Sequence, residues 1–322
     1  MKRLFFFPLL WLTGFWLASF SVLQAQEITS GKQDLSAINV LLIDGQGTHN
    51  WRESTPVLKR TLEETGLFEV TVQTVPDEGL DAFQPDFSAF DVVLLNYCGA
   101  RWNPKTCENL LSFVAAGGGL VLYHSANTAF PDWPDFQPLL GVTGWGGRAA
   151  DYGPYRYWDS ARGMVQASLP GPTGSLGSRQ EFLIQSCAPS HPIMRGLPEK
   201  MLHGPDECYA NLRGTAINAA NVTILAAASP VSLAPPDLPA QTDPQAPLAS
   251  AENSGRMEVS LAAVTYGKGR VFQILYGSAG KQCRSVAFIV PFLRGTQWAA
   301  TGTVTIPIPE DVPTEEKSYT RP

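Results

Sequence analysis

The chain has 322 residues, of which 44% are hydrophobic and 16% are charged, and its 29 acidic and 23 basic residues give a net charge of −6. A chain with so few cations is a poor candidate for binding nucleic acid, because that binding depends on Lys and Arg neutralising phosphates. The length and the apolar content fit one large or two small domains with a substantial core.

The first residues have the pattern of an export signal. Lys2 and Arg3 precede an apolar run at residues 4–22, which ends in the small-residue exit at residues 23–25. This order is typical of a secretory signal peptide, so we expect residues 1–25 to be removed and the mature protein to be periplasmic or secreted. The apolar run is also close to the roughly 20 residues that span a bilayer, and an uncleaved segment would anchor the protein in a membrane.

The cysteines have no spacing that is typical of a metal site. They are odd in number and include no CxxC pair, so metal ligation by cysteine is not expected. Outside the cytoplasm they allow two disulfides and one free thiol. They are equally compatible with small buried residues, and both interpretations stay open. The five are Cys98, Cys107, Cys187, Cys208 and Cys283.

The first half of the chain after the signal alternates apolar runs with amphipathic runs. Short apolar runs bounded by polar residues predict strands, and apolar residues on one helical face followed by Gly predict helices. Strands that alternate with helices imply parallel βαβ units, so we expect an α/β fold with a doubly wound, flavodoxin-like, mostly parallel sheet. The predicted strands are residues 38–43, 68–75, 91–96 and 120–123, and the predicted helices are residues 55–65 and 105–116.

The second half is less regular. Residues 229–255 are rich in Pro, Ala, Ser and Gln and predict a surface insertion. Two apolar runs around the turn at residues 266–269 predict a hairpin, and residues 285–298 predict a closing helix. We therefore expect one α/β domain at residues 38–303 with an embellished second half, and an extended or disordered tail at residues 304–322. The hairpin strands are residues 258–264 and 270–275.

The loops that follow the first-half strands are where a ligand is expected. In doubly wound sheets, ligands bind beyond the carboxyl ends of the strands. These loops carry an unusual density of polar and aromatic residues. They are residues 44–51, 97–104 and 124–133.

Several motifs in and beyond these loops resemble, in order, those of the ThuA-like family. The resemblance covers residues 38–310 and implies a class I glutamine amidotransferase-like fold, with an association with trehalose utilisation and related sugar metabolism. A fold alone does not specify a reaction. The motifs are His49-Asn50-Trp51, GGGLVLYHSA at residues 117–126, His191-Pro192-Ile193, DECY at residues 206–209, VTYGKGRVF at residues 264–272 and RGTQWAATG at residues 294–302.

The resemblance also places His124 at the nucleophile elbow, where the amidotransferases carry their catalytic cysteine. Cys98 lies on a different loop, the one that helps to hold the oxyanion in those enzymes. Thioester chemistry needs a low-pKa thiolate at the elbow beside a histidine base. Glutamine hydrolysis is therefore not expected.

His124 and Glu207 are the candidate catalytic residues. An imidazole at the carboxyl edge of the sheet can act as an acid, a base or a metal ligand near neutral pH, or it can simply bond loop backbone. Adjacent carboxylates do not face one point on regular structure. Of Asp206 and Glu207 we therefore assign the catalytic role to Glu207, as the partner of His124, with a solvated acidic turn as the alternative.

Five further side chains are assigned to substrate binding, and a metal is an option. Trp133, Trp145 and Trp158 could stack on a sugar, although aromatic residues are more often core. The sequence requires no cofactor, but His49, His124 and Glu207 offer a His/His/carboxylate set for a divalent metal. The substrate-binding candidates are His49, Trp51, Asp206, Tyr209 and His203.

The predicted function is that of an enzyme, a hydrolase or isomerase acting on a sugar, keto-sugar or glycoside. Family members commonly have Gly-His where this chain has Gly277-Ser278. That departure favours an alternative, a non-catalytic exported protein that binds a sugar. A membrane-tethered interaction protein would follow from an uncleaved signal. The sequence leaves the substrate and the oligomeric state open.

Overall fold

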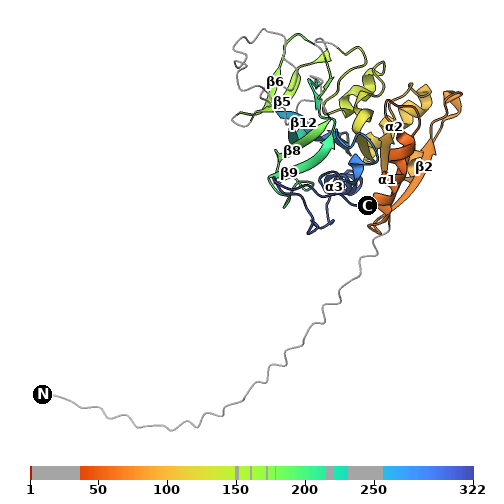
Figure 1. Ribbon diagram of the computed structural model, residues 1–322. Coiled ribbons are helices and arrows are strands. Elements are labelled where there is room, and N and C mark those ends of the chain that lie inside the picture. The colour runs from red at the N-terminus through yellow and green to blue at the C-terminus, as the bar shows by residue number, and fades with distance from the viewer. Residues whose placement is uncertain are drawn as a thin grey trace. The chain divides into compact units, whose positions relative to one another are not determined.

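A mixed β-sheet crosses the molecule (Figure 1). Five neighbouring strands in it pair in parallel. Each is a short apolar run, which suits strands that are covered on both faces. In β1, Val40 and Leu42 pack on one face while Leu41 and Ile43 pack on the other. In sheet order the parallel strands are β2 (Phe68–Thr74), β1 (Ile38–Asp44), β3 (Val92–Asn96), β4 (Gly119–Tyr123) and β13 (Gly269–Ile274).

The sheet continues beyond β13 in antiparallel strands. The expected hairpin is confirmed, since β13 pairs antiparallel with β12 (Met257–Tyr266) around the turn at residues 266–269. The chain thus adds an antiparallel half to a doubly wound parallel one. Beyond β12 come β11 (Val222–Pro230), β8 (Gln180–Ser186) and β9 (Lys200–Asp206), while β5 (Tyr155–Asp159) pairs with β12 and β6 (Gly163–Ala167), and β7 (Ser175–Leu176) pairs separately with β10 (Tyr209–Ala210).

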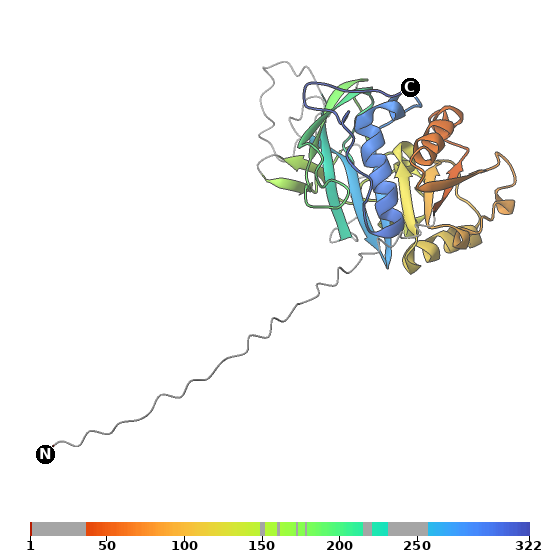
Figure 2. The ribbon, with the colours of Figure 1, turned by 90° about the horizontal axis from the view of Figure 1, so that it is seen from below.

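Helices cover both faces of the parallel half, so the expected α/β class is confirmed. α1 (Trp51–Glu63) and α3 (Val286–Thr301) pack into one core cluster, and α2 (Pro104–Ala116) packs into the other. α3 lies against β4 and β13 (Figure 2). Each fully buried Leu, Val or Ile side chain in these layers stabilises the fold by about 1.5–3 kcal/mol.

Two helix ends differ from their expected positions for identifiable reasons. α1 begins at Trp51 rather than residue 55, because the carbonyl of Asn50 already accepts hydrogen bonds from the amides of Glu53 and Ser54. α3 runs past residue 298 and stops at Gly302, whose φ of 78° is the left-handed conformation that ends helices.

The structure describes residues 1, 37–148, 152–159, 162–171, 173–177, 179–214, 221–230 and 257–322. The expected signal segment and nearly all of the expected insertion at residues 229–255 lie outside these ranges, and both stay predictions. No helix among the described residues is long and apolar enough to cross a membrane.

The tail at residues 304–322 has neither helix nor strand and follows the surface of the domain. Its backbone accepts hydrogen bonds from Leu202 at Thr314 (2.8 Å) and from Val286 at Tyr319 (2.9 Å). These bonds attach the last residues of the chain to the antiparallel half and to α3.

Candidate functional site

His124 stands at a strained turn where the carboxyl end of β4 meets the short 3-10 helix η3 (His124–Thr128). Its φ is 45°, a left-handed value that is uncommon for a residue other than glycine. Such strain persists only where the surrounding structure enforces it, and it clusters at functional sites. The elbow expected at His124 is therefore present in the backbone.

Both ring nitrogens of His124 have partners inside the protein. Nδ1 lies 3.0 Å from the carbonyl oxygen of Leu275. Nε2 lies 2.8 Å from the hydroxyl of Tyr209 and 3.1 Å from Nε2 of His49. The Tyr209 ring also stacks on the imidazole, with centroids 4.5 Å apart. Only 1% of the His124 side chain is exposed.

His49 reaches this histidine from the loop between β1 and α1. The two imidazoles meet edge to face, with ring centroids 4.5 Å apart. In contrast to His124, 25% of the His49 side chain is exposed. A ligand that approaches from solvent therefore meets His49 before His124.

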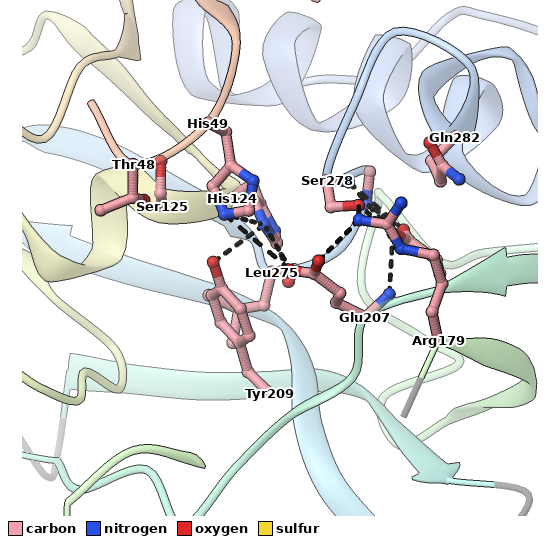
Figure 3. Close-up of polar contacts among 12 residues, drawn as sticks. Thr48, His49, His124, Ser125, Arg179, Glu207, Tyr209, Leu275, Ser278 and Gln282 are labelled. Atoms are coloured by element: carbon pink, nitrogen blue, oxygen red, sulfur yellow. Dashed lines mark hydrogen bonds and ion pairs between the residues drawn. The ribbon is translucent and has the colours of Figure 1, made fainter. Parts of the chain in front are cut away.

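The Glu207 carboxylate lies between the histidine pair and Arg179 (Figure 3). Oε1 accepts a hydrogen bond of 2.6 Å from Nη2 of Arg179. Oε2 lies 3.9 Å from Nε2 of His49 and 4.0 Å from Nε2 of His124. This second oxygen is buried and has no hydrogen-bond partner among the described residues. The structure thus brings together His49, His124, Glu207 and Tyr209.

Burial decides the protonation of these groups. Burial, with a smaller contribution from the neighbouring His49, lowers the pKa of His124 to about 3. Burial also lowers the pKa of His49, against the opposing effect of Glu207. The pKa of the Tyr209 phenol is raised well above its ordinary value, again chiefly by burial. At neutral pH the site therefore holds two neutral imidazoles and a protonated phenol.

Asp206 and His203 form a second, fully buried pair beside the site. Asp206 Oδ2 lies 3.1 Å from Nε2 of His203 and accepts the amide of Gly277 at 2.6 Å, and Oδ1 accepts the hydroxyl of Ser278 at 2.5 Å. Burial would raise the pKa of Asp206, but the hydrogen bonds from His203 and Ser278 hold it below its ordinary value. Both residues occupy a supporting position, with no exposed surface to offer a substrate.

The tryptophans proposed for sugar contact do not gather at the histidine pair. Trp51 begins α1, and the guanidinium of Arg52 lies 4.1 Å from its ring centroid. Trp133 is buried in an aromatic cluster. Trp158 lies on β5 and pairs with Met257 of β12, in the antiparallel half. Trp145 is the exception, because its ring contacts Tyr209 edge to face at 4.8 Å.

Sequence reasoning missed Arg179, which orients Glu207. It precedes β8 in an irregular part of the chain, where no periodicity fixes its position. All five cysteines are free thiols, so the disulfide interpretation does not hold. Cys98 lies beside the site with its sulfur 3.8 Å from the hydroxyl of Thr48, and it does not occupy the elbow.

A family model and two solved structures that match this chain carry the same family name. The sequence model for ThuA, described as trehalose utilisation, matches residues 39–299. The crystal structure of a putative ThuA-like protein from Parabacteroides merdae is 36% identical, with a TM-score of 0.78, and the match covers 89% of this chain and 98% of that one. A putative ThuA-like protein from Bacteroides uniformis shares the fold at 12% identity, with a TM-score of 0.51 and coverage of 83% and 93%. Among curated proteins, none matches significantly. The chain therefore belongs to the ThuA family.

Proposed function

We propose that this protein is an enzyme that acts on a sugar or sugar derivative, as a hydrolase or isomerase of a keto-sugar or glycoside. One observation carries the proposal: two neutral imidazoles, a phenol and a carboxylate converge at the carboxyl edge of the parallel sheet. This edge is where open α/β sheets bind ligands. The trehalose utilisation description of the family supports a sugar as the substrate class.

The exposed fractions of the four side chains indicate which of them face the substrate and which support them. His49 and Glu207 have 25% and 17% of their side chains exposed, so these two face the substrate. His124 and Tyr209 lie beneath them and are almost fully buried. With its pKa lowered to about 3, His124 is a weak base at neutral pH. Its part is to orient His49 and Tyr209, while the partly exposed carboxylate of Glu207 is the base that the substrate meets.

The reaction class follows from a carboxylate base and a protonated phenol that both lie beside His124. Isomerisation of a keto-sugar needs a base that removes a proton beside the carbonyl and a donor that bonds the carbonyl oxygen. Glu207 supplies the first group, and the phenol of Tyr209 supplies the second when it exchanges its bond to His124 for one to the substrate. Hydrolysis would use the same carboxylate to take a proton from water. A glutaminase is not proposed, because the elbow carries His124 in place of a thiol.

Turnover assays test this function directly. The purified protein is incubated with trehalose, keto-sugars and simple glycosides, and the products are followed by NMR. We expect one class to be converted, and Glu207→Gln to lower the rate by at least ~10²-fold, the usual effect of losing a general acid or base. Glu199→Gln is the matched control, because Glu199 is exposed and lies just before β9. Sugar binding without turnover would overturn the enzyme proposal in favour of a sugar-binding protein.

A further inference from the structure

Three side chains direct ligand atoms toward one point in this site. The Nε2 atoms of His49 and His124 are 3.1 Å apart, and Oε2 of Glu207 lies 3.9 and 4.0 Å from them. All three atoms lie within 4.8 Å of one another. Within the residues that the structure describes, no other group of His, Cys, Asp and Glu side chains has this arrangement.

The single lone pair of the His124 ring faces two possible hydrogen-bond donors. The carbonyl of Leu275 can only accept a hydrogen bond, so Nδ1 of His124 carries the proton and Nε2 carries the single lone pair. Both the Tyr209 hydroxyl and Nε2 of His49 face that lone pair. A ring nitrogen tied to a backbone carbonyl, with the opposite nitrogen free, is also the usual arrangement of a histidine that binds a metal.

Glu207 gives an independent indication of a ligand. Arg179 binds its Oε1, whereas Oε2 is buried without a hydrogen bond among the described residues. A buried carboxylate oxygen without a partner costs free energy, and native proteins rarely keep one without an ion or water nearby. This oxygen points toward the two histidine nitrogens (Figure 3).

We propose that His49, His124 and Glu207 bind one divalent transition metal ion of the Zn²⁺ type, with its fourth position open to water or a substrate oxygen. Around tetrahedral Zn²⁺, with bonds of about 2.0–2.1 Å, two ligand nitrogens lie about 3.3 Å apart. The observed separation of the two Nε2 atoms is 3.1 Å. Oε2 of Glu207 would move closer by less than about 1 Å, and it has no hydrogen bond to break.

The ligand set selects the class of metal. Two imidazoles with one carboxylate suit Zn²⁺ and its neighbours among the transition metals, whereas Ca²⁺ and Mg²⁺ prefer oxygen ligands alone. Such an ion would polarise a carbonyl or hydroxyl oxygen of the substrate, and water in its open position would then take over from Oε2 of Glu207 as the base. It would also take the lone pair that now faces Tyr209, which leaves the phenol free to bond the substrate. This role deepens the proposed function and rests on it, while the metal site itself does not.

Metal binding is measured without any substrate. The purified protein is treated with a chelator and then titrated with Zn²⁺ by calorimetry and with Co²⁺ by visible absorption. We expect one equivalent to bind, with a Co²⁺ spectrum free of thiolate charge-transfer bands. His49→Ala and Glu207→Gln should each weaken binding by about 100-fold or more, since even indirect contacts to a metal are worth 10–100-fold.

Two control variants separate this site from other donors. His191→Ala removes a histidine that packs on Trp298, and Cys98→Ser removes a thiol beside the site. Both should bind Zn²⁺ like the unaltered protein. His49 and Glu207 are partly exposed, so their variants are expected to fold, and circular dichroism checks this.

Three results would overturn the metal site: no Zn²⁺ binding, unchanged affinity in the His49 and Glu207 variants, or loss of binding in Cys98→Ser. Turnover of a sugar by protein that binds no metal would remove the metal and keep the proposed function. Zn²⁺ bound by these residues, without turnover of any sugar, would keep the metal site and overturn the proposed function.

Discussion

His49 and His124 are 75 residues apart in the sequence, yet their Nε2 atoms lie 3.1 Å apart across the end of β3. β3 pairs with both β1 and β4 in the parallel half, so the loop after β1 must cross the end of β3 to reach the elbow. The contact therefore joins the first and fourth strands of the chain over the sheet edge.

Tyr209→Phe separates the phenol from the ring that stacks on His124. We expect the rate on a sugar substrate to fall by at least ~10²-fold, because the proton donor is lost. Zn²⁺ affinity should change little, because the phenol is not a ligand. The free energy of unfolding should fall by no more than about 1 kcal/mol, the usual value of one hydrogen bond.

Tyr97→Phe is the control for this change. Tyr97 is also buried, and it donates a hydrogen bond of 2.6 Å to the carbonyl of Ala100, away from the histidine pair. It should keep full activity. Equal rates for the two phenylalanine variants would contradict a chemical role for Tyr209.

Arg179→Gln tests whether the guanidinium orients Glu207. Half of the Arg179 side chain is exposed, at 51%, so loss of the ion pair should cost less than about 1 kcal/mol of stability. Glu207 would lose its hydrogen bond at Oε1, and we expect Zn²⁺ affinity to fall by roughly 10-fold or more. Arg162→Gln, at an exposed pair with Asp159, should leave affinity unchanged. Unchanged affinity in Arg179→Gln would show that Glu207 holds its position without the arginine.

Ser278→Ala tests the buried support beneath the site. The Ser278 hydroxyl donates to Asp206, which is fully buried and ionised, and hydrogen bonds to charged groups are worth about 1.5–3 kcal/mol. We expect urea unfolding to report a loss of that size. Ser88→Ala breaks a similar bond to Asp86 at an exposed turn, and should cost only a few tenths of a kcal/mol. Similar losses of unfolding free energy in both variants would contradict the expectation that burial makes the Ser278 hydrogen bond worth more than the exposed one.

Much of the fold was predictable because buried parallel strands have a distinctive sequence. The run at residues 38–43 is apolar at nearly every position, and the structure shows the reason: alternate side chains enter the two core layers. Helix ends were less predictable. Asn50 is a residue type that favours helix starts, but its side chain makes no capping hydrogen bond, and the apolar pattern of α1 begins only several residues later.

The candidate site was predictable in part. His49 and His124 each follow a parallel strand, and such strands end at one edge of the sheet, so their proximity follows from topology. Glu207 was placed by the family motif, and it diverges from Asp206 because neighbouring residues at a strand end face opposite ways. Arg179 could not be placed from the sequence. Its contact with Glu207 joins two irregular segments, and tertiary packing alone brings them together.

Export is tested by the start of the mature protein. Cleavage after Ala25 would leave Gln26 as the first residue, because the apolar run ends in a small-residue exit there. N-terminal sequencing of protein from the periplasm or the medium should return that residue. Recovery of intact Met1 from a soluble cytoplasmic fraction would contradict export, and recovery from membranes would indicate an uncleaved anchor.

The pH dependence of stability should carry a contribution from His191, which lies outside the site. Burial, followed by the charge of Arg195, lowers its pKa to about 4 from the ordinary value of 6.5. Between these values the unfolded chain binds a proton that the folded protein does not. Stability must therefore fall as the pH drops from 6.5 toward 4. Because the ring is only half-buried, we expect the contribution to be about 1 kcal/mol or less.

His191→Asn removes this titration and keeps the local geometry. The asparagine oxygen can accept the amide of Ile193, which Nδ1 of His191 now accepts at 3.3 Å. Urea midpoints of both proteins are measured at pH 8 and at pH 4.5 with a chelator present. We expect the variant to lose less stability on acidification than the unaltered protein, while any difference at pH 8 reports packing against Trp298 alone. Equal losses on acidification would mean that His191 keeps an ordinary pKa in the folded protein.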